Sequence, residues 1–408
     1  MTPSPFAPAR FPSLPPIDGF TMATAEAGIK YSARADVWVL VGQPGTQVAG
    51  VFTQNRCPGA PVDWSREALT VQTNGPRIVV VNSGNANVFN GQKSRDTVLQ
   101  TAQGAAKAFG GDADAVQLAS TGVIGEALDA SKITDVFPAM TLKADGWEAA
   151  ARAIMTTDTH PKGATATADI RGHSVTINGI AKGSGMIAPD MATMLAYVAT
   201  DAALPQDVLQ DLLRQTVRTT FNAITVDSDT STSDTLLLLA SGAAGHPPIG
   251  SADDPALLDF RRALERVMFS LSQQVVKDGE GISKFVKINV HGAVTDISAR
   301  AIGMSVANSP LVKTAIAGED ANWGRIIMAV GKAGEPADRD RLTVMLGEHV
   351  LARKGQPNPD YREELGAAHM QGDRIEITID LGLGHGQFTV YTCDLTHAYI
   401  DINADYRS

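Results

Sequence analysis

The sequence has few cysteines, few aromatic residues and no excess of positive charge. Cys57 and Cys393 are its only cysteines, and they lie far apart without metal-ligand spacing. This argues against a disulfide framework or a zinc site and favours a reducing compartment. Aromatic residues make up 5% of the 408 residues, too few for a platform on which nucleic-acid bases stack. The net charge of −10 argues against a non-specific nucleic-acid or anionic-membrane surface, although it is compatible with a local basic site for a carboxylate.

Long hydrophobic runs are missing too. The strongest apolar run, residues 236–240, is far too short to span a bilayer, and the Pro-rich residues 1–20 lack the apolar core of a secretory signal. We therefore expect a cytoplasmic protein that does not associate with membranes. Its length allows two or three ordinary domains or one large layered unit with an ample core.

What is present is a mixture of strand and helix patterns. The N-terminal third predicts strands at residues 37–41 and 49–52, joined as a hairpin by a Gln-Pro-Gly turn. Residues 78–81 form a continuous apolar run, typical of a strand buried on both faces. The polar residues 82–87 then predict a turn, and helical spacing follows at residues 97–109.

The second half continues this mixture. An opening Leu-Pro predicts a helix over residues 204–217, and a second amphipathic helix spans residues 257–275. Alternating strands are predicted at residues 285–290 and 375–379, and the Gly- and Pro-rich residues 240–255 are the best candidate for a surface linker. Because helices and strands mix without a strict βαβ rhythm, the prediction is an α+β layered fold.

Residues 181–196 are the stretch most informative about chemistry. Gly183 and Gly185 allow close approach of the backbone, and Lys182 beside them adds a positive charge. A Gly-Ser-Gly next to a lysine could cradle a phosphate, but the spacing of a phosphate-binding P-loop is absent. Composition alone therefore favours an ordinary turn followed by a strand.

This segment and the blocks around it resemble the ornithine acetyltransferase family, the bifunctional glutamate N-acetyltransferases of arginine biosynthesis. Each block alone is weak, but their order along nearly the whole chain is specific. The resemblance implies an α+β layered sandwich like that of DmpA-type aminopeptidases. The matching blocks are residues 51–55, 82–87, 120–125, 155–159, 181–196, 221–227, 229–232, 278–281, 308–313, 318–320, 393–396 and 402–407.

The resemblance further implies that the precursor cuts itself between Ala192 and Thr193, giving an α chain of residues 1–192 and a β chain of residues 193–408. A threonine hydroxyl can attack the preceding carbonyl, and hydrolysis of the resulting ester then frees the threonine amine. Because an α-amine titrates at about pH 8, the freed amine of Thr193 could accept a proton near neutral pH. Thr193 would then carry its own general base beside its nucleophilic hydroxyl. No Ser-His-Asp triad is then required.

Other site residues also follow from the resemblance. The Thr121 side chain and the Gly122 N–H would form the oxyanion hole. Lys182 suits a substrate α-carboxylate, whereas Glu280 suits a cationic group or a proton transfer. The residues implied to bind substrate are Thr156, Lys182, Thr193, Glu280, Asn403 and Ser408. Thr157 remains an alternative to the threonine before it.

Sequence alone leaves an ordinary alternative for most of these positions. Thr121 could stand in a Thr-Gly turn after a strand, and Lys182 could be a solvated surface lysine. Glu280 could be a turn residue, and Asn403 could cap a structure near the chain end. Ser408 departs from the family, whose members usually end in threonine, but it keeps a hydroxyl and a terminal carboxylate.

The implied reaction is a ping-pong transfer. Thr193 takes acetyl from N-acetylornithine, ornithine leaves, and glutamate then takes acetyl from the acetyl-threonine ester. Acetyl-CoA is a possible further donor, no metal is implied, and two α and two β chains are expected to form a heterotetramer. The enzymatic alternative is an N-terminal-nucleophile aminopeptidase or amidase, which passes the acyl group to water. The non-enzymatic alternative is an acidic oligomeric scaffold.

Overall fold

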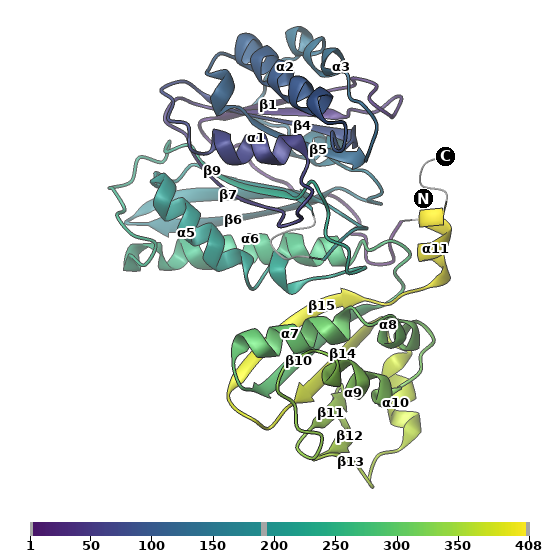
Figure 1. Cartoon of the computed structure of the whole chain (residues 1–408). Helices are drawn as coiled ribbons and strands as arrows, with labels where there is room; N and C mark the ends of the chain where they lie inside the picture. Colours follow the sequence, from purple (N-terminus) through teal and green to yellow (C-terminus); the bar gives the residue numbers. More distant parts are fainter. Residues whose placement is uncertain (1–2, 189–193, 405–408) are drawn as a thin grey trace. The chain divides into compact units, whose positions relative to one another are not determined.

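Two compact units make up the part of the chain that this computed structural model describes, residues 3–188 and 194–404 (Figure 1). Both contain sheets covered by helices, so the predicted α+β layered fold is confirmed. The two-sheet unit consists of Pro8–Asn222 and Asp229–Val275, and the one-sheet unit consists of the chain up to Ala7, Ala223–Ser228 and the chain from Val276 onward.

The two-sheet unit contains one sheet of four strands and one of five. The four-stranded sheet has the order β1 (Phe20–Ala25), β2 (Val37–Gly42), β4 (Arg77–Asn85) and β5 (Gln117–Val123), with β4 and β5 parallel. The five-stranded sheet has the order β3 (Gln47–Phe52), β9 (Thr235–Ala240), β8 (Leu195–Thr200), β7 (His173–Lys182) and β6 (Lys162–Ile170), with β8 and β9 parallel. The helices are α1 (Ala60–Ala68), α2 (Gln92–Phe109), α3 (Ala130–Thr134), α4 (Trp147–Ala153), α5 (Gln206–Val217) and α6 (Leu258–Val276).

Alternating side chains explain why the two sheets stack between layers of helices. Along β2, Trp38 and Leu40 lie in the core between the sheets, where the Trp38 ring meets Tyr197 of β8 with centroids 4.9 Å apart. Val37 and Val39 belong to the core on the opposite face, which α2 and α3 cover. Helices α5 and α6 cover the outer face of the five-stranded sheet (Figure 1). The strands are buried on both faces, and this explains their nearly unbroken apolar sequences.

The predicted hairpin between β2 and β3 is wrong, although both strands exist. β2 pairs with β1 and β4, whereas β3 pairs with β9 in the other sheet. A turn closed by the bond from Thr46 N–H to the Gln43 carbonyl, 3.1 Å long, takes the chain from one sheet to the other. Because β1 and β4 occupy both edges of β2, β3 pairs instead with the leucine-rich β9.

The polar turn predicted after residue 81 is also wrong, because β4 continues through Asn85. Its polar side chains are buried but hydrogen-bonded. Ser120 Oγ donates to Asn82 Oδ1 at 2.6 Å, and Ser83 Oγ donates to the Ala153 carbonyl at 2.8 Å. Since a buried polar group is tolerated once it has a partner, these residues extend the strand instead of ending it.

Residues 240–255 do not link the units, because the whole stretch lies within the two-sheet unit. His246 in this stretch is buried, and its Nε2 accepts a hydrogen bond of 2.9 Å from the Ala203 N–H. The chain instead passes between the units at four points, which follow Ala7, Asn222, Ser228 and Val275. The linker prediction failed because composition alone does not distinguish a packed irregular loop from a boundary.

The one-sheet unit is built on six strands. Their order is β13 (Gln356–Pro357), β12 (His349–Arg353), β11 (Thr343–Leu346), β14 (Arg374–Asp380), β10 (Phe285–Ala293) and β15 (Gly386–Cys393). Ile288 of β10, Ile302 of α7 and Ile326 of α9 share one core, so these helices pack against one face of the sheet. The helices are α7 (Asp296–Ala307), α8 (Pro310–Ala317), α9 (Trp323–Gly331), α10 (Glu363–Met370) and α11 (His397–Ala404).

Long periodic patterns gave correct predictions. The helix expected at residues 97–109 is α2, which begins earlier at Gln92. The helices expected at residues 204–217 and 257–275 are α5 and α6. The buried residues of α5 are Val208, Leu209, Leu212, Leu213 and Val217. The strands expected at residues 285–290 and 375–379 are β10 and β14, which pair in parallel.

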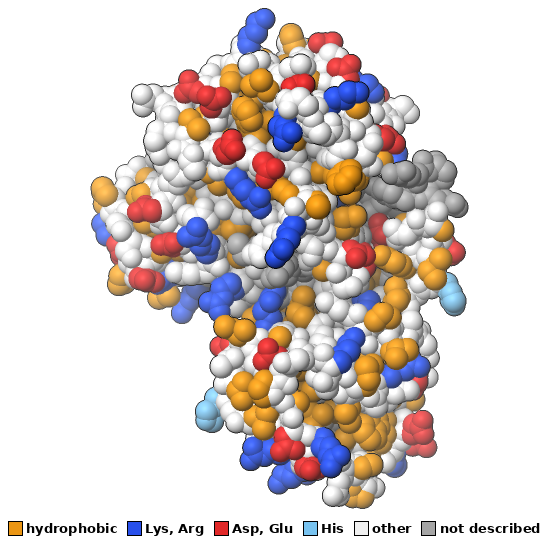
Figure 2. Space-filling model, viewed as in Figure 1, with side chains coloured by type: hydrophobic (Ala, Val, Ile, Leu, Met, Phe, Trp, Pro, Cys, Tyr) orange, Lys and Arg blue, Asp and Glu red, His pale blue; other side chains and the backbone are white. Residues whose placement is uncertain are grey.

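Acidic and basic side chains are mixed over the face of the molecule shown in Figure 2. Within residues 3–188 and 194–404, no helix combines the length and the apolar character needed to cross a membrane.

Candidate active site

The structure brings together two of the predicted site residues, Thr121 and Lys182. Thr121 lies near the end of β5 and Lys182 is the last residue of β7, so each sits where its own sheet ends. Both are 8% exposed, and Lys182 Nζ donates to Thr121 Oγ1 at 3.3 Å. Because this hydroxyl accepts a hydrogen bond from the ammonium, its own proton is available for another acceptor. The solvated-lysine alternative is therefore wrong.

At Gly122 the backbones of strands β4 and β5 approach each other so closely that a side chain would not fit. Its φ is +131°, and a Cβ added to it would lie 2.3 Å from the carbonyl carbon of Gly84 on β4. The pairing of β4 and β5 shifts register at this point. Thr121 and Gly122 lie inside β5, so the alternative of a turn after the strand is wrong. Glycine is required here both for its backbone angle and for its lack of a side chain.

Asp158 is the residue of this region that sequence reasoning missed. Its Oδ1 accepts hydrogen bonds from Lys162 Nζ and from the Gly183 N–H, both at 2.6 Å, and its Oδ2 accepts from the Thr156 N–H at 3.0 Å. Burial would raise the pKa of Asp158, but Lys162, Lys182 and the Gly183 N–H outweigh it and lower the pKa below its usual range. Asp158 therefore ties the loop at residues 156–158 to the end of β7 at Lys182.

We expect Asp158→Asn to destabilise the protein strongly. The side chains of Asp158 and Lys162 are both fully buried, so the variant leaves a buried ammonium without its counter-charge. Such a loss lowers the free energy of unfolding by about 3–5 kcal/mol, which denaturant titration measures. The folded-state pKa of this carboxyl is lowered, so its stabilisation is present above about pH 4 and is lost as the pH falls further.

A matched control is Glu148→Gln, which removes the 2.7 Å ion pair with Arg152 on the surface of α4. Because both of these side chains are more than half exposed, this variant is expected to cost less than about 1 kcal/mol. Equal losses for the two variants would contradict the structural role given to Asp158.

Thr156 and Thr157 lie beside the segment that follows β7. The Thr156 backbone is held by Asp158, and Thr157 Oγ1 is 2.7 Å from Ser184 Oγ. Both threonines are half-buried. The assignment of the substrate contact to Thr156 stays a prediction.

The structure brings together a second pair, Glu280 and Asn403, in the one-sheet unit. Asn403 Nδ2 donates to Glu280 Oε2 at 2.7 Å, and Glu280 is buried. Asn403 stands inside α11, so the expected alternative of a capping residue is wrong. The same helix is held by a bond of 2.6 Å from Thr396 Oγ1 to the Gly281 carbonyl. Glu280 and Asn403 belong to the one-sheet unit, whereas Lys182 belongs to the two-sheet unit.

We expect Gly281→Ala to weaken substrate binding. Gly281 has a φ of +70°, and a Cβ there would lie 2.5 Å from the Tyr399 nitrogen, so α11 must move and take Asn403 away from Glu280. KM should rise at least about tenfold, which corresponds to about 1.4 kcal/mol of binding. Gly382→Ala is the control, because Gly382 has a φ of +63° but its nearest neighbour would lie at an ordinary 3.5 Å. A normal KM for Gly281→Ala would contradict a role for α11.

Three predicted residues, Ala192, Thr193 and Ser408, lie outside the described residues. The chain resumes at Met194, whose carbonyl accepts a bond of 3.1 Å from the Thr235 N–H. Leu195, the first residue of β8, pairs with Lys182 on β7. The described chain after the predicted cleavage point therefore begins beside Lys182.

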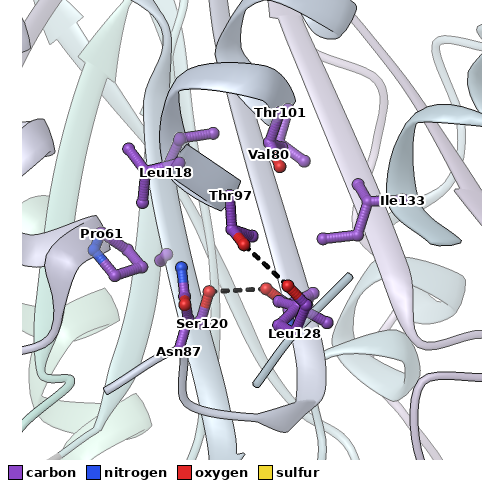
Figure 3. A pocket seen from close by; sticks show the side chains of 12 residues that line it. Pro61, Val80, Asn87, Thr97, Thr101, Leu118, Ser120, Leu128 and Ile133 are labelled. Carbon is purple, nitrogen blue, oxygen red and sulfur yellow. Dashed lines mark hydrogen bonds between the residues drawn. The ribbon is translucent and has the colours of Figure 1, made fainter. Parts of the chain in front are cut away.

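A small cavity lies on the helix-covered face of β4 and β5 (Figure 3). Ser120 borders it, and Thr97 Oγ1 donates to the Leu128 carbonyl at 2.7 Å beside it. Asn87 Oδ1 and Thr101 Oγ1, which also belong to its lining, are buried without a partner among the described residues. These two polar atoms could hydrogen-bond to a buried water, whereas a cavity this small has no room for an amino-acid substrate.

Among residues 3–188 and 194–404, no three His, Cys, Asp or Glu side chains come together in a way that could hold a metal ion. The prediction that no metal takes part rests on the resemblance and on the choice of Thr193 as nucleophile.

The comparisons with known proteins agree with each other. Residues 21–408 match the ArgJ family. Two curated relatives, from Mesorhizobium japonicum and Brucella suis, bear the name Arginine biosynthesis bifunctional protein ArgJ, and each is 55% identical over 410 residues, which cover 99% of this chain and 99% of the relative. The crystal structure of Arginine biosynthesis bifunctional protein argJ from Bacillus halodurans is 38% identical, covers 52% of this chain and 99% of its own, and has a TM-score of 0.50.

Proposed function

Because the chain belongs to the ArgJ family, it is an acetyltransferase of arginine biosynthesis, and we propose that it carries acetyl from N-acetylornithine to glutamate on Thr193. The relatives at 55% identity support a glutamate N-acetyltransferase and do not favour the aminopeptidase or amidase alternative. The observation that carries the proposal is the hydrogen bond from Lys182 to Thr121 at the ends of two strands from different sheets.

The first proposed step is self-cleavage. The Thr193 hydroxyl attacks the Ala192 carbonyl, the peptide bond becomes an ester, and water hydrolyses the ester to free the Thr193 amine. That amine then acts as the general base for its own hydroxyl. Cleavage thus precedes every turnover.

The second proposed step is acetyl transfer through a tetrahedral intermediate. Thr193 Oγ attacks the acetyl carbonyl of N-acetylornithine, and the Thr121 hydroxyl and the Gly122 N–H stabilise the oxyanion. The bond from Lys182 supports this role, because it leaves the Thr121 proton available to the oxyanion. Losing one such donor costs about 10²–10³ in kcat. Ornithine leaves, and glutamate attacks the acetyl ester.

The remaining residues bind the amino-acid part of the substrate. Lys182 and the Thr156 region bind the α-carboxylate, whereas Glu280 binds the cationic amine or takes part in proton transfer. Asn403 orients Glu280 through their 2.7 Å bond, and the terminal Ser408 contributes its hydroxyl and carboxylate.

The two pieces remain associated after cleavage. Strands β3, β7 and β6 come before the cut and β8 and β9 come after it, yet all five form one sheet. Separating the pieces would break the pairings of β7 with β8 and of β3 with β9. We propose that two α and two β chains form a heterotetramer in the cytoplasm. Acetyl-CoA serves as a further acetyl donor for glutamate, and no metal takes part.

One incubation tests the transferase against the hydrolase. Purified protein is mixed with N-acetylornithine, with and without glutamate, and ornithine, acetylglutamate and free acetate are followed. The proposal predicts that sustained ornithine release requires glutamate and is matched by acetylglutamate. Release of free acetate at full rate without glutamate would establish the hydrolase instead.

A further inference from the structure

Arg34 is a half-buried guanidinium that the steps above do not use. It lies in the loop of residues 26–36 between β1 and β2, and its Cζ stands 4.1 Å from the centroid of the Tyr31 ring. One of its amino groups, Nη2, donates to the Met155 carbonyl and, at 3.4 Å, to Ser83 Oγ. The ring contact and the two hydrogen bonds hold the side chain in one orientation.

These contacts place the guanidinium at the candidate active site. Ser83 on β4 pairs with Thr121 on β5, and two positions before each of them lies a residue of the core between the two sheets. Because side chains alternate along a strand, both hydroxyls point between the sheets. Arg34 donates to the first hydroxyl and Lys182 to the second. Since paired strands lie about 4.8 Å apart, the two cations contact neighbouring hydroxyls at the end of one sheet.

The other nitrogens of Arg34 are available to a ligand. Within residues 3–188 and 194–404, its Nη1 and Nε have no hydrogen-bond partner and its charge has no ion pair. Two carboxylates of this region are already occupied: Asp36 accepts two backbone N–H groups of the loop, at 2.6 and 2.7 Å, and Asp158 binds Lys162. A guanidinium that is fixed in place and lacks a counter-charge suits an anion that can accept two parallel N–H bonds.

Backbone strain accompanies this arrangement. Ala33, directly before Arg34, has a φ of +59°, a left-handed conformation that is unfavourable for a residue with a side chain. The loop is also tied to β4, because the Ser83 N–H donates to the Asp36 carbonyl at 2.9 Å. Strain of this kind persists where the surrounding structure holds it, and it is concentrated at functional sites.

We propose that Arg34 binds the side-chain carboxylate of the acetyl acceptor and so selects glutamate, an inference that rests on the proposed acetyl transfer. The two amino acids that this transfer exchanges differ in their side chains, because glutamate ends in a carboxylate and ornithine in an amine. Lys182 binds the α-carboxylate that both have, and Arg34 binds the carboxylate that only glutamate has. No bond changes at Arg34, which determines specificity without taking part in the chemical steps.

The test compares two acceptors on purified Arg34→Gln. This substitution keeps a polar side chain but removes the charge. N-acetylornithine is the donor in both assays, the acceptor is either glutamate or isotopically labelled ornithine, and mass spectrometry measures the acetylated product. For glutamate, kcat/KM should fall at least about tenfold, mainly through a higher KM. For labelled ornithine, kcat/KM should stay within about twofold of the wild-type value, because ornithine has no second carboxylate to lose a partner.

Two further variants control this comparison. Arg34→Lys keeps the charge but not the planar fork, so it should recover part of the activity with glutamate. Arg171→Gln makes the same substitution in the turn before β7, at the opposite end of this strand from Lys182, where Arg171 Nη2 donates to Asp254 at 2.8 Å. It should leave both acceptors unaffected. If thermal unfolding shows that Arg34→Gln does not fold, Arg34→Lys decides the question by the same comparison of acceptors.

The outcomes separate this inference from the proposed function. Equal losses for the two acceptors, or unchanged kinetics with glutamate, would overturn the role of Arg34 and leave the acetyl transfer intact. A loss confined to glutamate and partly restored in Arg34→Lys would support it. A wild-type enzyme that acetylates neither glutamate nor labelled ornithine would overturn the proposed function itself, and the inference with it.

Discussion

A chain in which Thr193 is replaced by alanine is expected to stay a single polypeptide and to lose acetyl transfer. Alanine has no hydroxyl to attack the Ala192 carbonyl, so the α-amine is never freed. It also has no oxygen to hold the acetyl group between the two half-reactions. Since both functions fall on one atom, activity should drop at least about 10⁴-fold, as for other lost nucleophiles. Denaturing electrophoresis and an assay of acetylglutamate formation measure the two effects.

Thr193→Ser is the control for this substitution, because serine keeps the hydroxyl and removes a methyl group. It should still be cleaved and should keep measurable activity. An uncut Thr193→Ala chain with wild-type activity would contradict the mechanism, because acetyl would then travel by another route.

Gly122→Ala is expected to damage both stability and catalysis. Its Cβ would lie 2.3 Å from the Gly84 carbonyl carbon and 2.6 Å from the Asn85 nitrogen, so β4 and β5 must separate there. We expect a loss of about 3 kcal/mol or more in the free energy of unfolding, together with a fall in kcat of at least about 10²-fold. Denaturant titration and single-turnover acetylation of the enzyme measure these losses.

Gly125→Ala separates backbone strain from steric collision. Gly125 also has a positive φ, +86°, but an added Cβ would meet nothing within 4 Å. This variant should lose only about 1 kcal/mol and keep its kcat. If the two glycine variants behaved alike, strain alone would explain the effect, and the close approach to Gly84 would have no special role.

Sequence patterns predicted the positions of helices and strands better than they predicted which strands pair with each other. The period of α5 and the apolar runs of β4 and β10 were readable because burial fixes local side-chain spacing. The pairing of β3 with β9 was not readable, because it joins residues nearly two hundred positions apart. The extension of β4 through Asn85 also depended on distant partners, the serine of β5 and the Ala153 carbonyl.

The site residues that the family resemblance named were predicted from the sequence. A residue whose role depends on contacts made only in the folded chain was missed. Thr121 with Lys182, and Glu280 with Asn403, are the pairs that the structure brings together. Asp158 lay inside a matching block but carried no role, because its partner Gly183 stands 25 residues later, directly after β7, and only the fold brings the two together. Its spacing of four residues from Lys162 was the one signal available, and it fits many surface ion pairs.

The most direct test of the account is the mass of the fully active protein under denaturing conditions. Two masses, corresponding to residues 1–192 and 193–408, are predicted, with the second beginning at a free threonine amine. One mass for the uncut chain, in a preparation that turns over at its full rate, would contradict it.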